Sequence, residues 1–436
     1  MSQNCLFICS PSLGLLDNWI PVLNKLKKQK FKIDIFFPKI STVEQFNTSN
    51  FLSKEAFKTF NNVIYQDLYD DLFISKFNKK FVEDIGLNKT LKKTRSIIMR
   101  FINQEAFLGD KIFYALNNIL IKLKLSHTKI NTTYFKTYTF ICYDMYEEYK
   151  PYIKKLNPVF KKIKKFSLHH GSDFPATNKN LSKKKINVQN VYPILFTNSQ
   201  LEKNYYKNNF IFKNKLKSLG CPKHDEKWTT LVKKRKISFP FKEKYVLLIS
   251  RNVDNNYLPS KRKLKYLKII KKIIIDRNYK LVVKLHPKED SESGKNFYFK
   301  IFKNKHYNKK WKFSSEIPLA LSRNAKFIVS FFSGVAVDMC AQKKTTIELL
   351  DLKGLEHKAS KSDLFYDKFN NEPIFRVRWN GFVLGTSDEK QFKSKVNWVI
   401  NNEKKSNEKF YSHFSKFYKY HKKASENVYN HIINNI

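Results

Sequence analysis

Short apolar strands alternate with helices in two separate stretches of this sequence. In the first stretch, an apolar strand at residues 6–9 precedes small residues at 10–14, a helix to about residue 30 and a strand at 32–37. The alternation begins again after residue 244, with strands at 245–250, 280–285, 326–332 and 345–351. Strand–helix–strand units indicate parallel strands covered by helices. The chain is therefore expected to be an α/β protein.

A length of 436 residues favours two domains, because single cores of ordinary size hold about 100–200 residues. The basic stretch 227–244 contains Pro240 and separates the two alternating regions. We expect Rossmann-like domains at 1–226 and 245–386 that face a cleft, joined by the linker 227–244. Residues 387–436 are expected to form helices that pack back toward the first domain.

The charge is strongly positive, with 84 Lys and Arg against 37 Asp and Glu and a net charge of +47. The lysines are spread along the whole chain, which also is rich in Asn, Ile, Phe and Tyr. Two explanations stay open: a compositional bias of the genome, or contact with an anionic membrane face or an acidic polymer. No nucleic-acid-binding module is recognisable, so a nucleic-acid partner is not expected.

Five cysteines without a CxxC pair are expected to be buried free thiols in a reducing cytoplasm. No charged segment precedes an apolar stretch at the N-terminus, which argues against a signal peptide. The least polar run, 327–341, has 15 residues and carries Asp338, so we expect a buried strand and turn there. No cluster of metal ligands is visible, and no cofactor is expected. We expect a cytoplasmic protein, with peripheral contact at the inner face of the cytoplasmic membrane left open.

Three polar clusters follow predicted strands, where ligands bind in open α/β sheets. The first, HHGSDFPATNKN at 169–180, contains His170 and Asp173. An imidazole titrates near neutrality and suits proton transfer. The alternative is a loop histidine that is bonded only to backbone.

The second cluster is KLHPKE at 284–289, after a buried strand. Pro287 fixes the backbone and holds His286 toward the cleft, where the histidine can donate to a phosphate oxygen or a ribose hydroxyl. Lys284 or Lys288 would supply positive charge. A His-Pro pair alone is common in proteins, so this cluster depends on its neighbours.

The third cluster is VSFFSGVAVD at 329–338, read as strand, turn and helix. Ser333, Gly334 and the first amides of the helix are expected to bind an anion, because unpaired N–H groups and the helix dipole favour negative charge. Asp338 is expected to orient the turn or to contact a ribose. A plain structural hydrogen bond is the alternative for Asp338.

The order HHGSD, FTNSQLEKNYYKNNF, GCPKHD, KLHPKE and SFFSGVAVD resembles the CDP-glycerol glycerophosphotransferases of teichoic-acid synthesis. The later part is also similar to HP-motif sialyl- and Kdo-type transferases. The resemblance covers about 168–351 and implies a GT-B fold, with 1–226 as acceptor domain and 245–386 as nucleotide-donor domain. It implies that His170 is the general base or another key catalytic histidine. His286 would bind the donor phosphate, and Ser333, Gly334 and Asp338 would close around the nucleotide.

Some positions depart from the pattern of this family. Ser172 replaces a threonine, and Lys223 stands where arginine is usual, although Pro222 and Asp225 match the family's turn. The family's arginine-bearing stretch is replaced by ISRN, which leaves Arg251 as a stand-in.

Further on, Phe331–Phe332 replaces Asp-Tyr, and Gly334 replaces a second serine. A CMP-linked acidic sugar needs fewer phosphate contacts than a CDP-polyol, so these changes favour a donor such as CMP-Kdo or CMP-sialic acid. We therefore expect a metal-independent glycosyltransferase that uses a nucleotide-sugar donor and a cell-surface glycan or lipid-linked acceptor.

Three alternatives remain at this stage. One is a polyol-phosphate transferase of teichoic-acid type that uses CDP-glycerol or CDP-ribitol. Another is a UDP-sugar epimerase, which should carry paired acidic residues and an arginine in the cleft. The third is a nucleic-acid-binding protein that uses the positive charge.

Overall fold

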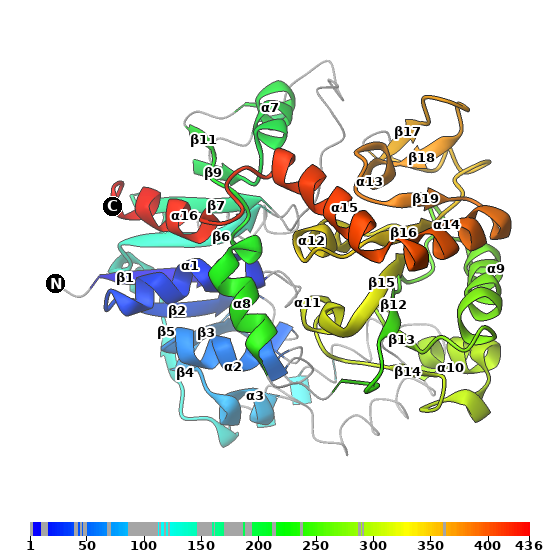
Figure 1. Cartoon of the computed structure of the whole chain (residues 1–436). Coiled ribbons are helices and arrows are strands. Elements are labelled where there is room, and N and C mark those ends of the chain that lie inside the picture. Colours follow the sequence, from blue (N-terminus) through cyan, green and yellow to red (C-terminus); the bar gives the residue numbers. More distant parts are fainter. Residues whose placement is uncertain are drawn as a thin grey trace.

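Two separate sheets organise the chain in the computed structural model, each at the centre of one lobe (Figure 1). The expected α/β fold with two Rossmann-like halves is confirmed. The structure describes residues 3–9, 16–38, 42–43, 46, 50–67, 71–85, 112, 115–116, 119–120, 123–145, 159–160, 162–169, 186–187, 194–211, 215–235, 239–286, 289, 292–360 and 363–436.

The first sheet, here the N-terminal sheet, has nine strands in the described residues, in the order β11-β9-β7-β6-β1-β2-β3-β4-β5. The strands are β1 (Asn4–Ile8), β2 (Lys32–Phe37), β3 (Asn62–Gln66), β4 (Leu72–Lys76), β5 (Thr128–Ile130), β6 (Phe140–Met145), β7 (Lys164–His169), β9 (Ile194–Thr197) and β11 (Lys215–Ser218). The six strands from β11 to β2 are parallel with their neighbours, and β3 continues the parallel part. Strands β4 and β5 add an antiparallel edge that the sequence pattern did not reveal.

Helices and a small ribbon complete the N-terminal lobe. The helices are α1 (Leu16–Lys28), α2 (Asn50–Thr59), α3 (Lys79–Ile85), η3 (Thr132–Thr137), α7 (Gln200–Asn209), η5 (Pro222–His224) and α8 (Glu226–Lys234). The ribbon pairs β8 (Ile186–Asn187) with β10 (Phe210–Ile211). Pro21 lies inside α1 and removes the amide that would otherwise bond the carbonyl of Asp17, so the start of this helix is irregular.

The second sheet, here the C-terminal sheet, has six parallel strands in the described residues, in the order β14-β13-β12-β15-β16-β19. The strands are β12 (Tyr245–Ile249), β13 (Leu281–Lys284), β14 (Trp311–Phe313), β15 (Ala325–Ser330), β16 (Thr346–Leu349) and β19 (Leu384–Thr386). The connecting helices are α9 (Ser260–Ile270), η6 (Lys271–Ile275), α10 (Glu292–Phe302), η8 (Asn304–His306), α11 (Pro318–Leu321), η9 (Ser322–Asn324) and α12 (Val335–Ala341).

An antiparallel hairpin and three long helices follow the core of the second lobe. These elements are β17 (Leu364–Tyr366), β18 (Pro373–Phe375), α13 (Arg376–Trp379), α14 (Glu389–Asn401), α15 (Glu403–Phe417) and α16 (Ala424–Ile433). Helix α15 runs along the second lobe toward the first, and α16 lies against α1 (Figure 1). The last helix thus joins the end of the chain to the beginning. The proposed domain boundaries stay a prediction.

One apolar core continues from the first lobe into the second. It contains Trp19 of α1 and Trp228 of α8, and it reaches Leu247 and Ile249 on one face of the C-terminal sheet. The opposite face of that sheet packs against α9, α10 and α14 in a second core. The junction of the lobes is therefore closed by apolar contact on one side.

Helix α9 packs its apolar residues into the second core, because Leu267 and Ile270 are fully buried, as is Ile274 in η6. Lys263 of the same helix is 2% exposed, whereas the other lysines of α9 are exposed. All five cysteines are free and buried. Among the described residues, no helix is long and apolar enough to span a bilayer.

Candidate functional site

Adjacent strands of the C-terminal sheet carry the residues predicted to bind a nucleotide. Arg251 follows β12, Lys284 ends β13 and His286 lies two residues further on, and Ser333 and Gly334 follow β15. The strands β13, β12 and β15 are neighbours, so their carboxyl ends form one continuous edge. The structure therefore brings these five residues to one side of the sheet. Pro287 lies outside the described residues.

Arg251 and Phe332, two residues that depart from the family's pattern, contact each other at this edge. The guanidinium carbon of Arg251 lies 4.6 Å from the centroid of the Phe332 ring. A planar guanidinium stacks well on an aromatic face, so Phe332 supports the arginine that stands in for the family's residue. The Ser333 hydroxyl accepts a hydrogen bond from the Val335 amide at 3.3 Å, and the Lys284 ammonium donates to the Ser315 carbonyl at 2.8 Å.

A buried polar network contacts the loops that follow β12 and β13 and supports them. Lys263 forms an ion pair with Glu289, and it also donates to the Arg251 carbonyl at 2.8 Å. The Tyr298 hydroxyl donates to the same Glu289 oxygen at 2.7 Å, and it is also hydrogen-bonded to Ser250. Burial lowers the pKa of Lys263 against the opposing pull of Glu289. Because each group has a partner, the network holds both loops in place.

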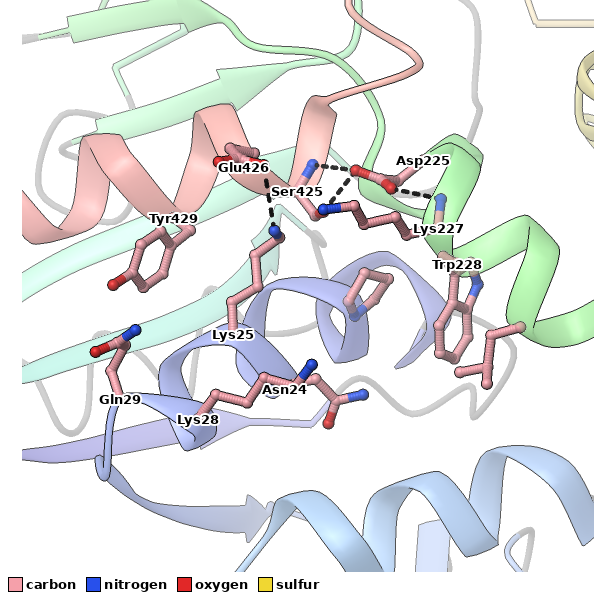
Figure 2. Close-up of a pocket in the computed structure, with 12 residues that line it drawn as sticks. Asn24, Lys25, Lys28, Gln29, Asp225, Lys227, Trp228, Ser425, Glu426 and Tyr429 are labelled. Carbon is pink, nitrogen blue, oxygen red and sulfur yellow. Dashed lines mark hydrogen bonds and ion pairs between the residues drawn. The ribbon is translucent and has the colours of Figure 1, made fainter.

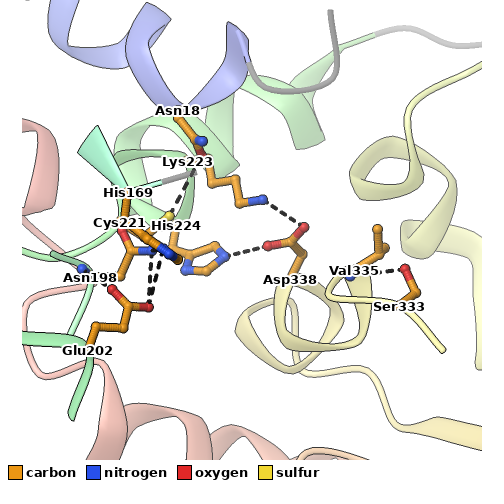
Figure 3. A network of polar contacts seen from close by, with 10 residues as sticks. All are labelled: Asn18, His169, Asn198, Glu202, Cys221, Lys223, His224, Ser333, Val335 and Asp338. Atoms are coloured by element: carbon orange, nitrogen blue, oxygen red, sulfur yellow. Dashed lines mark hydrogen bonds and ion pairs between the residues drawn. The ribbon is translucent and has the colours of Figure 1, made fainter. Parts of the chain in front are cut away.

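Asp338, for which a plain structural hydrogen bond was the alternative to a role at the turn or at a ribose, contacts the other lobe. Its carboxylate accepts from the Lys223 ammonium at 2.9 Å and from the His224 Nε2 at 2.7 Å (Figure 3). Lys223 and His224 belong to η5, in the GCPKHD stretch that follows β11. The carboxyl edges of the two sheets therefore meet at this three-residue contact.

The geometry of η5 explains why consecutive residues contact different parts of the molecule. Pro222 begins the turn, and Lys223 and His224 point toward α12. Asp225 then serves as N-cap of α8, because its carboxylate accepts from the Lys227 amide at 2.9 Å. The other Asp225 oxygen accepts from the Ser425 hydroxyl in α16 at 2.6 Å. The turn that matches the family's pattern is therefore held by contacts on both sides, to Asp338 of the second lobe and to Ser425 of α16.

The charges at this contact are fixed by burial and by neighbouring carboxylates. Burial alone would lower the pKa of Lys223, but Asp338 and Asp17 outweigh it and the pKa lies above its usual value. Burial lowers the pKa of His224 more than Asp338 raises it. Neutral His224 therefore donates from Nε2, and its Nδ1 has no hydrogen-bond partner in the described part of the chain.

Two acidic residues that the sequence analysis did not select as site residues lie at the same junction. Asp17 is in the first turn of α1, the helix that follows β1 in the chain, and Asp144 lies near the end of the adjacent strand β6. Burial raises the pKa of Asp17 to about 7, with Lys223 opposing and Asp338 adding to the shift. Asp17 is half-buried, so solvent reaches part of the residue.

Asp144 is fully buried, and among the described residues the Trp19 indole N–H is the donor that acts on its carboxyl, outside normal hydrogen-bond geometry. Burial, and then the charge of Asp17, raise the pKa of Asp144 well above its usual value. Both carboxyls are therefore harder to ionise than an ordinary aspartate. A buried carboxyl without a well-placed partner is costly, which makes such groups candidates for a role in chemistry.

The predicted catalytic residues His170 and Asp173 lie outside the described residues. The preceding His169 ends β7 and is buried, with its Nδ1 3.3 Å from the Asn198 amide and 3.7 Å from Glu202 (Figure 3). His169 is therefore surrounded by residues of α7 and of the loop that precedes this helix.

A separate groove of about 490 Å³ lies on the outer side of the first lobe. It is lined by α1, α8 and α16, and includes Lys25, Trp228 and Tyr429 (Figure 2). An ion pair of 3.5 Å joins Lys25 to Glu426 at its rim. The groove contains none of the predicted site residues, so the junction and not the groove is the candidate site.

Metal ligands do not gather in the described part of the chain, where no three His, Cys, Asp or Glu side chains are placed to hold an ion. Asp17, Asp144 and Asp338 all lie at the junction, but the Asp338 carboxylate already forms an ion pair with the Lys223 ammonium.

Comparison with known proteins establishes the fold. No protein-family model matches the chain, and no curated protein matches it by sequence. The solved UDP-GlcNAc 2-epimerase from Neisseria meningitidis, bound to UDP-GlcNAc, aligns with a TM-score of 0.53 at 11% identity and covers 100% of both chains. The chain has a GT-B fold.

Two further solved structures support the same conclusion. A putative UDP-N-acetylglucosamine 2-epimerase from Listeria monocytogenes aligns with a TM-score of 0.52 at 10% identity, covering 100% of this chain and 96% of the other. The S. aureus protein MnaA, in a co-structure with UDP, aligns with a TM-score of 0.50 at 11% identity and covers 100% and 98%. At this identity the likeness concerns the fold, and the narrower transferase families stay predictions.

The sequence contained a partial signal for the residues that were missed. Asp17 was noted only as a favourable charge at the start of a helix, the one that follows the first strand. Asp144 lies inside the apolar run TFICYDM, where a carboxylate without a function would be costly. Nothing in the sequence indicated that Lys223 and His224 contact Asp338, more than 100 residues away.

Proposed function

We propose that the protein transfers a sugar from a nucleotide donor to an acceptor hydroxyl at the junction of its two sheets. The observation that carries the proposal is the pair Asp17 and Asp144, which lies opposite the loops of the C-terminal sheet. A carboxyl with a pKa of about 7 both takes up and releases protons at neutral pH, as a general base must.

The proposed reaction uses Asp17 as the base. Its carboxylate removes the proton from the acceptor hydroxyl, and the acceptor oxygen forms a bond to the anomeric carbon of the donor sugar. The bond from that carbon to the phosphate oxygen breaks, and its electron pair leaves with the nucleotide. Burial disfavours the charged form of Asp144 beside the base. His170, with Asp173, remains the predicted alternative base.

The loops of the C-terminal sheet are proposed to hold the departing phosphate. Arg251, stacked on Phe332, and His286 would neutralise its negative charge, and the Ser333 hydroxyl and Gly334 would bond its oxygens. Lys284 is already bonded to a carbonyl and would contribute charge at longer range. This modest set of cations suits one phosphate better than two, so we propose a CMP-linked acidic sugar as donor. The proposed acceptor is a cell-surface glycan or its lipid-linked precursor.

A second candidate function is epimerisation of a UDP-sugar. The pair of acids and Arg251 are the features expected of such an enzyme, in which one acid removes a carbon-bound proton and another returns it. The structures that share the fold include UDP-GlcNAc 2-epimerases. A polyol-phosphate transferase would use the same phosphate loops with a CDP-linked donor.

A donor panel tests these proposals together. The full-length protein is incubated with CMP-sialic acid, CMP-Kdo, CDP-glycerol or UDP-GlcNAc, with and without a glycan acceptor, in D₂O buffer. Transfer predicts release of CMP that rises when the acceptor is added. Epimerisation predicts deuterium at a sugar carbon without any acceptor. A protein that neither binds nor changes any of the four donors contradicts both proposals.

A further inference from the structure

A stripe of exposed apolar side chains lies outside the candidate site. Ile112, Leu116, Ile119 and Leu123 are 43%, 43%, 55% and 78% exposed. These four positions are helical in the structure. Spacings of four, three and four residues are those of one face of an α-helix. Soluble proteins seldom expose contiguous apolar surface of this kind without a partner.

The C-terminal end of this stripe is attached to the edge of the N-terminal sheet. Three residues after Leu123, the Ser126 carbonyl accepts a hydrogen bond from the Ser75 hydroxyl of β4 at 3.0 Å. Strand β5 follows and pairs with β4 as the outermost strand of the sheet. The chain directly after the stripe is therefore fixed to the edge of the N-terminal sheet.

Exposed lysines surround this attachment point. Lys124 follows the stripe directly, Lys76 ends β4, and Lys79 and Lys80 begin α3. Two of the nearby acids form ion pairs with lysines, Glu83 with Lys79 at 3.1 Å and Asp71 with Lys129 at 3.0 Å, and Asp84 is a third acid in α3. The apolar stripe is thus bordered by net positive charge.

We propose that this stripe docks the protein on an anionic lipid surface. An apolar helix face bordered by lysines lies well in a membrane interface, with its aliphatic side chains among the acyl chains and its ammonium groups at the anionic headgroups. A second copy of the chain would bring the same lysines against each other, and each copy carries a net charge of +47, so self-association through this face is disfavoured. The proposal does not depend on the reaction at the junction.

A test must separate the stripe from the charge of the whole chain. With a net charge of +47, the protein binds anionic vesicles at low salt through any face. Sedimentation of the full-length protein with phosphatidylcholine vesicles, with and without phosphatidylglycerol, is therefore measured at low and at high salt. We expect binding that requires phosphatidylglycerol and persists in part at high salt, where screening leaves the apolar contribution.

The variant Leu116→Asp with Ile119→Asp tests the stripe. We expect about 100-fold weaker partitioning at high salt, because two aliphatic side chains no longer insert. The matched control is Tyr366→Asp with Phe369→Asp in the β17–β18 hairpin, where the side chains are 47% and 100% exposed and the change in charge is the same. The control should bind vesicles like the wild type. Equal losses in both variants would overturn the assignment to the stripe.

A direct measurement of insertion covers the case in which a variant folds poorly. All five native cysteines are buried, so a polarity-sensitive dye attached through Leu123→Cys labels one chosen place. We expect a blue shift of its emission with anionic vesicles, and none from the same dye at Phe369→Cys. A dye at Leu123→Cys that stays in water while the protein is vesicle-bound would overturn the proposal. A dimer in solution that the Asp variant abolishes, without vesicle binding, would identify the face as a self-interface instead.

Discussion

The two sheet edges that meet at the junction are built in opposite ways. Below the C-terminal edge, Lys263, Glu289 and Tyr298 satisfy each other's polar groups. At the N-terminal edge, burial raises the pKa of Asp144 well above its usual value and that of Asp17 to about 7. Satisfied networks make rigid binding loops, whereas acids with shifted pKa values are suited to proton transfer. This contrast is the basis for our proposal that one edge binds the donor and the other carries the base.

Removing the proposed base should give the largest effect. Asp17→Asn is expected to lower turnover of the donor about 100- to 10,000-fold, because general-base catalysis contributes that much to the rate. Nucleotide affinity, measured by calorimetry, should change little. Asp144→Asn replaces a carboxyl whose charged form burial disfavours by a neutral amide and should cost at most about tenfold. Turnover that survives Asp17→Asn within a factor of a few would remove Asp17 from the mechanism.

Breaking the contact between the lobes should lower stability strongly. Asp338→Ala leaves the buried Lys223 without its carboxylate, so we expect the free energy of unfolding to fall by about 3–5 kcal/mol in denaturant titrations. As a control, Asp276→Ala removes an exposed partner of Lys271 and should cost less than about 1 kcal/mol. Similar losses in the two variants would mean that the contact does not join the lobes energetically.

Binding at the C-terminal edge should depend on Arg251 and His286. Each change to alanine is expected to weaken nucleotide binding about 10- to 100-fold, because each removes one hydrogen bond to a charged phosphate. His286→Ala should also lower activity in the same measurement series. Lys284→Met should have a smaller effect, since its ammonium is already bonded to Ser315. Unchanged affinity for CMP, CDP and UDP in both alanine variants would refute the assigned roles.

The raised pKa of Asp17 also predicts a modest dependence of stability on pH. Its pKa is about 7 in the folded state against an ordinary value of 3.8, so the folded state binds the proton more tightly. Stability from this group is present below pH 4 and is lost as the pH rises toward 7. The melting temperature of Asp17→Asn, relative to wild type, should therefore be higher at pH 8 than at pH 5. A difference that is independent of pH would indicate an ordinary carboxylate.

Much of the fold followed from the sequence, and part of the site did not. Strands such as 32–37 were located well because apolar β-branched and aromatic runs end at turn residues. The edge strands β4 and β5 were missed, since short half-exposed strands carry a weak pattern. The phosphate loops were found because they directly follow buried strands.

The sequence did not reveal the roles of Asp17 and Asp144 or the contact between the lobes, because these depend on residues that are far apart in the chain. Asp338 was assigned to its own turn, since a sequence does not reveal that Lys223 will face it from the other lobe. The burial of Lys263 is not visible in the sequence, because its partner Glu289 lies 26 residues later, beyond any helical spacing. Side-chain partners across a junction are fixed by packing of whole elements, and local patterns do not contain them.

The pH dependence of donor cleavage tests the central claim most directly. In the wild type, kcat/KM for the CMP-linked donor should rise with an apparent pKa near 7 as Asp17 loses its proton. In Asp17→Asn the residual rate should lose this step, whereas His170→Ala should retain it. A step that persists in Asp17→Asn and disappears in His170→Ala would contradict the account and return the role of base to the histidine.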